Sequence, residues 1–313
     1  MTTFGLQLPN FGFGVPDDQM FDEVVARALA AEESGFGSLW VMDHFYQLPA
    51  LGGADQPMLE AYTLLGALAA RTGSVHLGAL VSGVTYRNPA MLAKIVTTLD
   101  VVSRGRAVLG LGAAWHDLEH HGYGFEFPPV GERMDRLEDA LQICRAMFER
   151  DHVTFEGRHH RTDDARNLPR PVQPGGPRIL VGGGGERRTL RLVARYADAC
   201  NLHGDPDTIR HKIEVLHGHC AEVGRDPAEV RVTRLATLVV TQSAQQTGEL
   251  QNFLARAAGP EALSTSNLGQ PGEVVEQIHA LAEAGVEEFL FNMPLADPSA
   301  IRAAGDLFRD AFG

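Results

Sequence analysis

The stretch from Val75 to Gly124 constrains the fold more than any other part of the chain. Its first seven residues, Val75 to Val81, are an apolar run without alternation, which is typical of a strand buried on both faces of a parallel sheet. Asn88 and Pro89 suit a helix N-cap and first helical residue, and apolar residues then recur at helical spacing. A second apolar strand, Ala107 to Leu111, follows at once. Strand, helix and strand in this order predict one right-handed parallel unit.

The same alternation runs through the rest of the chain. The segments that read as buried strands, separated by helical patterns, are residues 4–9, 38–42, 75–81, 107–111, 178–181, 199–202, 230–240 and 288–292. Eight such strands predict a (β/α)8 TIM barrel with insertion segments, formed by residues 1–313 as a single domain. A doubly wound open sheet is the alternative, which the regular eightfold count disfavours. Residues 153–177 hold a hairpin-like piece and proline-rich loop, interpreted as an insertion rather than a linker.

Composition limits the partners and the compartment. The 313 residues carry a net charge of -13, and an acidic surface argues against nucleic acid or an anionic membrane as a partner, since both need clustered positive charge. The three cysteines show no C-x-x-C spacing, which indicates neither a disulfide framework nor a zinc ribbon. No signal peptide pattern and no uncharged apolar stretch of about 18 residues is present. These features favour a cytoplasmic protein.

Polar residues at strand ends are the candidates for chemistry, because a TIM barrel works at the carboxyl ends of its strands. Asp43 and His44 end the second strand. An imidazole can give or take a proton near neutral pH, and a neighbouring carboxylate can fix its tautomer. A plain turn is the alternative. Position alone also nominates Asn10, Ser82, Trp115, His116, Asn201, His203, Arg234 and Asn292.

Two glycine-rich segments also end predicted strands. Gly182, Gly183, Gly184 and Gly185 precede a helix, so their backbone N–H groups, the helix dipole and Arg187 or Arg188 predict an anion site that suits a phosphate tail. The spacing does not match a Rossmann fingerprint, and a tight strand-to-helix turn is the alternative. Gly110 and Gly112 allow something to approach the backbone closely, and Trp115 beyond them is either a stacking wall for a ligand or part of the barrel rim.

A competing motif lies just after this strand. His116, Glu119 and His120 spell H-x-x-E-H, the inverted zinc peptidase signature, with both histidines on one face of a helix. Short matches of this kind arise by chance, and no well-placed third ligand follows downstream. A solvated helix face is the favoured interpretation, with a zinc hydrolase as the remote alternative and no metal expected.

Three ordered motifs link the chain to a known family. RNPAMLAK, TLDVVSRGRAVLGLGAAW and GERMDRLEDAL resemble the luciferase-like monooxygenase superfamily, and most closely its branch of coenzyme F420-dependent oxidoreductases. The resemblance covers the chain from Phe4 to about Asn201 and thins out beyond. The sequence departs from the sugar-phosphate dehydrogenases of the family, which place an acidic catalytic residue near the position of Trp115.

The resemblance implies an oxidoreductase that transfers a hydride between coenzyme F420 and a small organic substrate. It places His44 beside the reactive ring and implies a bulge at Leu80, Val81 and Ser82, often with a non-proline cis peptide, whose backbone supports the ring. Gly110, Gly112 and Trp115 would also contact the cofactor, and a homodimer is expected. An FMN-dependent monooxygenase using reduced flavin and oxygen is the nearest alternative, and a catalytically idle flavin-binding barrel a more distant one. The sequence leaves open the substrate, the direction of hydride transfer and which peptide bond is cis.

Overall fold

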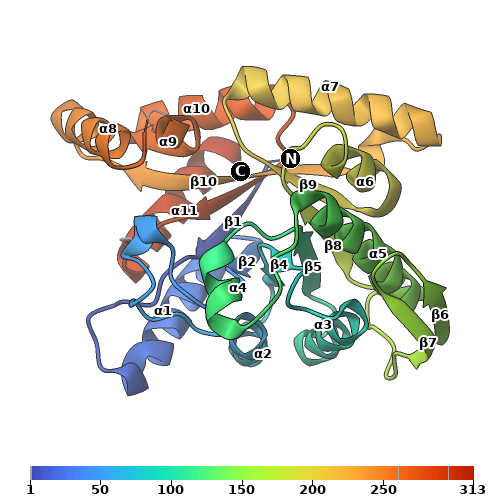
Figure 1. Cartoon of the computed structure of the whole chain (residues 1–313). Helices are drawn as coiled ribbons and strands as arrows, with labels where there is room; N and C mark the ends of the chain where they lie inside the picture. The colour runs from blue at the N-terminus through green and yellow to red at the C-terminus, as the bar shows by residue number, and fades with distance from the viewer. Residues whose placement is uncertain (1, 260, 295) are drawn as a thin grey trace.

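The computed structural model describes residues 2–259, 261–294 and 296–313. Within these ranges, eight parallel strands form a ring that helices surround (Figure 1). The ring consists of β1 (Thr3–Leu8), β2 (Ser38–Val41), β3 (His76–Ala79), β5 (Ala107–Gly112), β8 (Arg178–Gly182), β9 (Ala199–Leu202), β10 (Arg231–Val240) and β12 (Glu288–Asn292). Pairing of β1 with β12 and of β9 with β10 closes it. The predicted (β/α)8 barrel is therefore confirmed, and the doubly wound open sheet is wrong.

Helices cover the outside of the ring. The larger ones are α1 (Met20–Glu33), α2 (Ala61–Arg71), α3 (Pro89–Ser103), α5 (Val130–Glu149), α6 (Thr189–Tyr196), α7 (Pro206–Val223), α8 (Ala244–Ala258), α10 (Pro271–Glu283) and α11 (Pro298–Phe312), and α4 (Asp117–Tyr123) and α9 (Glu261–Ser264) are short. The predicted cap at Asn88 is confirmed, because its side chain accepts hydrogen bonds from the backbone N–H groups of Ala90 and Met91. Within the described ranges, no helix combines the length and apolar character needed to cross a bilayer.

The core has two layers, as in other barrels of this type. One lies between strands and helices and holds most of the buried apolar side chains. The other fills the interior of the ring with side chains from different strands, namely Trp40, Val108, Leu180, Ala199 and Leu290. The ring is thus a packed core and not a channel, so a ligand has access only at its ends.

The third strand is shorter than the sequence suggests. It ends at Ala79, a cis peptide bond joins Leu80 to Val81, and the chain resumes pairing with β5 only at β4 (Ser82–Gly83). Two glycines of the neighbouring strand β5 make room for this bulge: a Cβ on Gly110 would lie 2.1 Å from the Ala79 carbonyl oxygen, and one on Gly112 would lie 2.6 Å from Val81 Cγ2.

One strand and two helix starts differ from the predictions. β11 (Ser266–Gly269) extends the sheet by pairing with the last four residues of β10. Its sequence, SNLG, lacks the apolar and β-branched run that signals a strand. The segment is a strand only because it pairs with the edge that β10 supplies. The sequence predicts that the second helix begins at about Met58 and that the helix after the four glycines begins at Glu186, but the structure starts them at Ala61 and Thr189.

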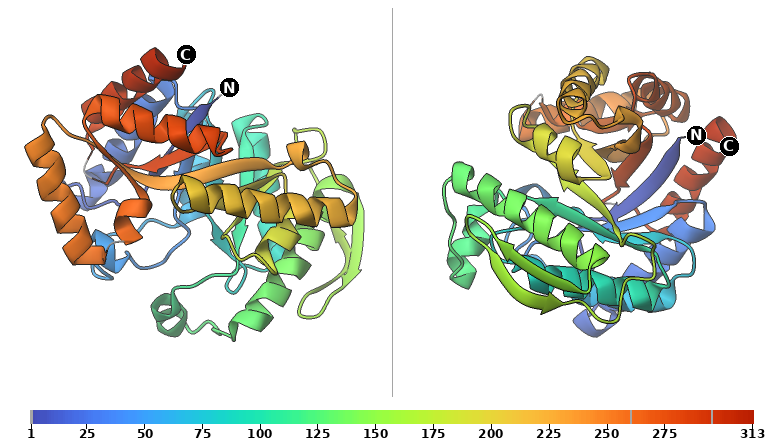
Figure 2. Two further views of the ribbon diagram at one scale, coloured as in Figure 1. Left: turned by 90° about the horizontal axis from the view of Figure 1, so that it is seen from above. Right: turned by 90° about the vertical axis from the view of Figure 1, so that its right-hand side faces the viewer.

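The predicted insertion is confirmed as a hairpin. β6 (His152–Glu156) and β7 (Arg161–Arg166) pair antiparallel in a separate two-stranded sheet. Figure 2 shows this hairpin beside α5, on the outside of the barrel. It adds no residue to the barrel mouth, where the candidate site lies.

Candidate active site

A cavity of about 730 Å³ opens at the carboxyl ends of the barrel strands. This volume is within the range of small-molecule and cofactor sites, about 300–1,000 Å³. Its wall takes residues from most of the strands, among them Gln7, His44, Leu80, Val81, Gly112, Trp115, Glu119, Gly182, Gly183, Asn201, His203, Thr237 and Asn292. The barrel therefore brings together at one cavity about half of the residues that the sequence nominated separately.

His44 is held by a buried carboxylate that the sequence did not assign to it. Its Nδ1 lies 2.8 Å from Oε1 of Glu119, and the other oxygen of Glu119 accepts a hydrogen bond of 2.8 Å from the backbone N–H of Phe45. Glu119 is only 1% exposed. Burial acts to raise the pKa of Glu119, but the hydrogen bond and charge of His44 and the Phe45 N–H group outweigh it and lower the pKa. An ionised Glu119 thus fixes the imidazole and leaves Nε2 for a ligand.

Asp43 has a different role from the one expected of a residue next to His44. Both of its carboxylate oxygens accept hydrogen bonds from Arg87, at 2.8 and 2.6 Å, and Arg87 also bonds Glu60 at 2.6 Å. Burial raises the pKa of Asp43, and the hydrogen bonds and charge of Arg87 oppose that rise. The carboxylate that orients His44 is therefore Glu119 and not Asp43.

The H-x-x-E-H motif is part of this packing. Glu119 bonds His44, while His120 Nε2 lies 2.6 Å from Thr85 Oγ1 and His120 Nδ1 lies 2.7 Å from the His116 carbonyl oxygen. Glu119 and His120 are both buried, so the expected solvated helix face is wrong. In the part of the chain that the structure describes, no three His, Cys, Asp or Glu side chains are grouped to hold a metal ion.

The bulge after β3 forms the floor of the cavity. Leu80 and Val81, joined by the cis peptide bond, both line it, which assigns the bond that the sequence left open. Ser82 is fully buried and shares a hydrogen bond of 2.7 Å with the hydroxyl group of Tyr62. The bulge therefore presents two residues to the cavity and anchors the third in the core.

Trp115 and the glycines of β5 occupy different places. Trp115 is 62% exposed at the cavity wall, and its ring stands edge-on to His44 with the centroids 5.7 Å apart. Gly112 lines the cavity, whereas Gly110 lies behind the bulge. The open space that Gly110 was expected to leave for a ligand is occupied by the Ala79 carbonyl group.

The glycine loop after β8 forms another part of the wall. Gly182 and Gly183 line the cavity, and Gly183 has a φ of +111°, a conformation that side chains rarely adopt. Arg188 turns away to bond the carbonyl oxygen of Gly131 and the carboxylate of Asp135, while Arg187 is exposed.

Sequence reasoning missed a cation beside the same loop. A Cβ on Gly184 would lie 3.8 Å from Cε of Lys212, which reaches the loop from α7. Its Nζ donates a hydrogen bond of 2.5 Å to Glu186. The sequence offered one signal for Lys212: it contains only two lysines, Lys94 and Lys212, so each of them was worth considering as a candidate.

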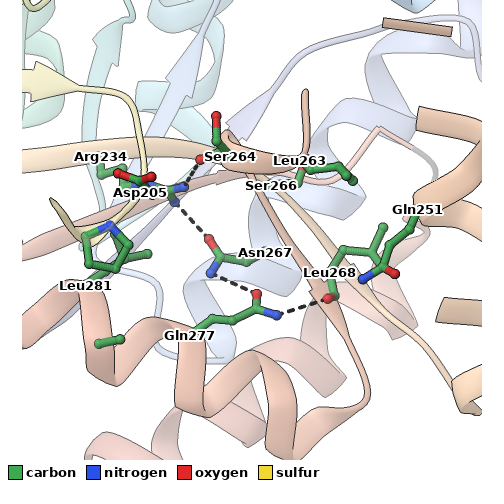
Figure 3. Close-up of a pocket in the computed structure, with 12 residues that line it drawn as sticks. Asp205, Arg234, Gln251, Leu263, Ser264, Ser266, Asn267, Leu268, Gln277 and Leu281 are labelled. Carbon is green, nitrogen blue, oxygen red and sulfur yellow. Dashed lines mark hydrogen bonds between the residues drawn. The ribbon is translucent and has the colours of Figure 1, made fainter. Parts of the chain in front are cut away.

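Arg234 lies at a separate pocket of about 290 Å³ and not at the large cavity (Figure 3). Its guanidinium donates to the carbonyl oxygens of Gly204 and Ser264 and to the side chain of Asn267, at 3.0, 2.9 and 2.9 Å. Burial lowers the pKa of Arg234 to about 10. Arg234 therefore ties β10 to the segments around it and does not reach the cavity at the barrel mouth.

The sequence matches the model of a known family over most of its length. The luciferase-like monooxygenase profile matches residues 2–259, and the chain belongs to that family. The cis peptide predicted from the resemblance is present at its expected segment, between Leu80 and Val81.

Its relatives include F420-dependent enzymes. An F420-dependent glucose-6-phosphate dehydrogenase of Amycolatopsis mediterranei is 35% identical over 176 residues, which cover 56% of this chain and 50% of that protein. One of Nocardia farcinica is 28% identical over 303 residues, covering 87% of this chain and 88% of the relative. The chain thus spans about half the length of several of the curated relatives that it matches, and most of the length of others.

Solved structures share the whole fold. An F420-dependent secondary alcohol dehydrogenase in complex with an F420-acetone adduct superposes with a TM-score of 0.82 at 21% identity, covering 99% of this chain and 98% of the other. The EDTA monooxygenase of Chelativorans sp. BNC1 superposes with a TM-score of 0.84 at 14% identity, covering 100% of this chain and 95% of the other. At these identities the likeness establishes the barrel alone.

Proposed function

We propose that this protein is an oxidoreductase that transfers a hydride between coenzyme F420 and a small organic substrate. The observation that carries the proposal is His44, held by the buried Glu119, at the wall of a cavity whose floor is the Leu80–Val81 peptide. The choice of F420 as the cofactor is supported by the F420-dependent enzymes among the relatives.

The cavity has room for such a cofactor. A Cβ on Gly183 would meet no heavy atom closer than 3.6 Å, so the loop offers open space beside the backbone. In the proposal, Leu80, Val81 and Ser82 support the ring through the backbone of the bulge. Gly112 and Trp115 flank the ring, and Gly110 contributes through the bulge that it accommodates. The loop Gly182–Gly185, with Arg187, holds the phosphate.

The chemistry is divided between cofactor and protein. When bound, F420 supplies the carbon centre that accepts or gives the hydride. His44 removes a proton from an alcohol substrate as the hydride leaves and returns it in the reverse direction, through Nε2. The charge of Glu119 stabilises the imidazolium that forms. General acid-base catalysis of this kind contributes about 10² to 10⁴ in rate.

The organisation of the protein is also proposed. Residues 1–313 act as one domain, and the protein works in the cytoplasm as a homodimer. The family resemblance supports the dimer, and the acidic, cysteine-poor composition fits a reducing compartment. Light scattering at working concentration is expected to give twice the mass of 33.9 kDa, and a single-chain mass would contradict the dimer.

A direct test of the function compares two cofactors. Protein is titrated separately into F420 and FMN while the fluorescence of each is followed, and F420 is expected to bind more tightly. Reduction of bound F420 by alcohols, followed by its absorbance, then tests hydride transfer. A clear preference for FMN, with oxygen consumption by the reduced complex, would instead establish the monooxygenase alternative.

A further inference from the structure

We propose that Lys212 joins Arg187 in binding the cofactor phosphate at the glycine loop, and that Glu186 pairs with Lys212 until the phosphate displaces it. This inference rests on the proposed function, because it concerns the phosphate of the same cofactor. It assigns a phosphate-binding residue to α7, and it predicts that Lys212 exchanges its present partner, the carboxylate of Glu186, for the phosphate.

The position of Lys212 points to a ligand at this loop. Its Cε lies 3.8 Å from where a Cβ on Gly184 would stand, next to the two glycines that line the cavity. The Lys212 side chain is 22% exposed, so the ammonium group is partly shielded from water while still accessible. A phosphate held by the backbone of the loop would therefore be within reach of its flexible four-carbon stem.

The present partner of Lys212 is suited to being displaced. The Glu186 carboxylate is 42% exposed, and the same oxygen that bonds Lys212 at 2.5 Å lies 3.2 Å from His211 Nε2. When a phosphate takes Lys212, Glu186 keeps His211 and water as partners. The exchange leaves no buried charge unpaired, and ion pairs that are exposed to water are individually weak.

The backbone of the loop does not depend on this ion pair. His219 Nε2 lies 2.8 Å from the Glu186 carbonyl oxygen, and the Leu190 N–H group donates to the carbonyl oxygen of Gly185 at 3.0 Å. These contacts hold the loop against α7 and start α6. The charge of Lys212 is therefore free for a ligand without loss of the loop conformation.

A purely structural role for the ion pair makes a different prediction. If Lys212 and Glu186 only joined α7 to the loop, removal of either side chain would change cofactor binding in the same direction or leave it unchanged. In the exchange model the two residues act in opposite directions, because Lys212 attracts the phosphate and Glu186 competes with it.

The experiment measures F420 affinity by fluorescence for the wild type, Lys212→Met, Glu186→Gln and the control Lys94→Met. Lys94 is the other lysine of the chain and lies on α3, bonded to the Leu168 carbonyl oxygen. Lys212→Met is expected to weaken binding about 10-fold or more, the effect of losing one charge-assisted hydrogen bond. Glu186→Gln is expected to tighten binding about 3-fold, and Lys94→Met to leave it unchanged.

The phosphate itself is tested with the dephosphorylated chromophore of F420. Its affinity is expected to be the same in the wild type and Lys212→Met. If Lys212→Met weakened the binding of F420 and of its dephosphorylated chromophore equally, the proposed exchange would be wrong. Weaker binding of F420 in Glu186→Gln would also contradict it. If the wild type binds FMN and not F420, the proposed function fails, and FMN with riboflavin then tests Lys212 in the same way. Wild type that binds neither phosphorylated cofactor would overturn both proposals.

Discussion

The two sides of the barrel mouth hold their charges in opposite ways. On the β2 side, the carboxylates of Asp43 and Glu119 are 1% exposed and bonded through both oxygens. On the β8 side, Glu186 is 42% exposed and Lys212 22%. Both sides stand at strand ends of one barrel, yet only the first is part of the core.

This difference separates two tasks. A buried charge whose partner is removed is costly, so the β2 side keeps one arrangement and is suited to holding His44 in place for proton transfer. Exposed pairs are weak and screened by water, so the β8 side can exchange partners when a phosphate arrives. We therefore expect substitutions on the β2 side to affect turnover and stability, and those on the β8 side to affect cofactor affinity.

The largest effect is expected from His44→Ala. Loss of the imidazole should lower turnover about 10² to 10⁴-fold and leave F420 affinity within a few-fold, because we propose that the side chain acts in the chemical step. Turnover with a substrate found by the alcohol screen, together with fluorescence titration, measures both. His121→Ala, on the exposed face of the same helix as Glu119, is the control. Unchanged turnover in His44→Ala, with a deuterium isotope effect showing that chemistry limits the rate, would remove His44 from the mechanism.

The second prediction concerns the buried ion pair. Arg87→Met leaves Asp43 buried without its partner and should lower the free energy of unfolding by about 3–5 kcal/mol. The control Arg158→Ala removes a side chain that is 73% exposed and should cost less than about 1 kcal/mol. Urea denaturation measures both. Similar losses in the two variants would show that the β2 side is no more rigidly paired than the surface.

Asp43→Asn in the Arg87→Met background sharpens this test. The double variant removes the carboxylate charge that Arg87→Met leaves unpaired, so it should recover part of the lost stability. If the double variant recovered no stability, the cost of Arg87→Met would come from the lost packing of the Arg87 guanidinium over the Tyr62 ring. The guanidinium carbon lies 4.8 Å from the centroid of that ring.

The third prediction separates two neighbouring glycines of the β8 side. Gly183→Ala forces a side chain into a φ of +111°, which costs about 1–3 kcal/mol and should weaken F420 binding about 10-fold by shifting the loop. Gly184 does not have a left-handed backbone conformation, and a Cβ there would meet no heavy atom closer than 3.8 Å. Gly184→Ala should therefore change F420 affinity less than about 2-fold. Equal affinities for the two variants would show that the loop conformation does not support the cofactor.

The smallest effect is a change in the pH dependence of stability. The pKa of Glu119 is held below its ordinary value of 4.5, so its charge stabilises the fold at neutral pH and loses that contribution as the pH falls through the folded-state pKa. Glu119→Gln lacks the charge. The gap in unfolding free energy between wild type and Glu119→Gln should therefore be widest near pH 7 and narrow below pH 4.5. A gap that stays constant with pH would contradict an ionised Glu119.

Much of the fold could be predicted because its signals are local. The helical spacing after Asn88, the cap itself and the apolar strands are set by neighbouring residues, and the hairpin in the insertion was equally readable. β11 could not be predicted, since Ser266 to Gly269 pair only because β10 is longer than its other neighbours. The resemblance located the cis peptide to one segment, and the structure chose the Leu80–Val81 bond.

The candidate site divides in the same way. The sequence by itself determined that His44 and the four glycines would stand at strand ends, because strand periodicity and turn residues fix where each strand stops. Only the tertiary structure decided their partners: Glu119 is 75 residues from His44, and Lys212 is 26 residues from Glu186. The partner depends on which strand and helix ends the closed ring brings side by side. Asp43, the residue adjacent to His44 in sequence, instead pairs with Arg87, which is 44 residues away.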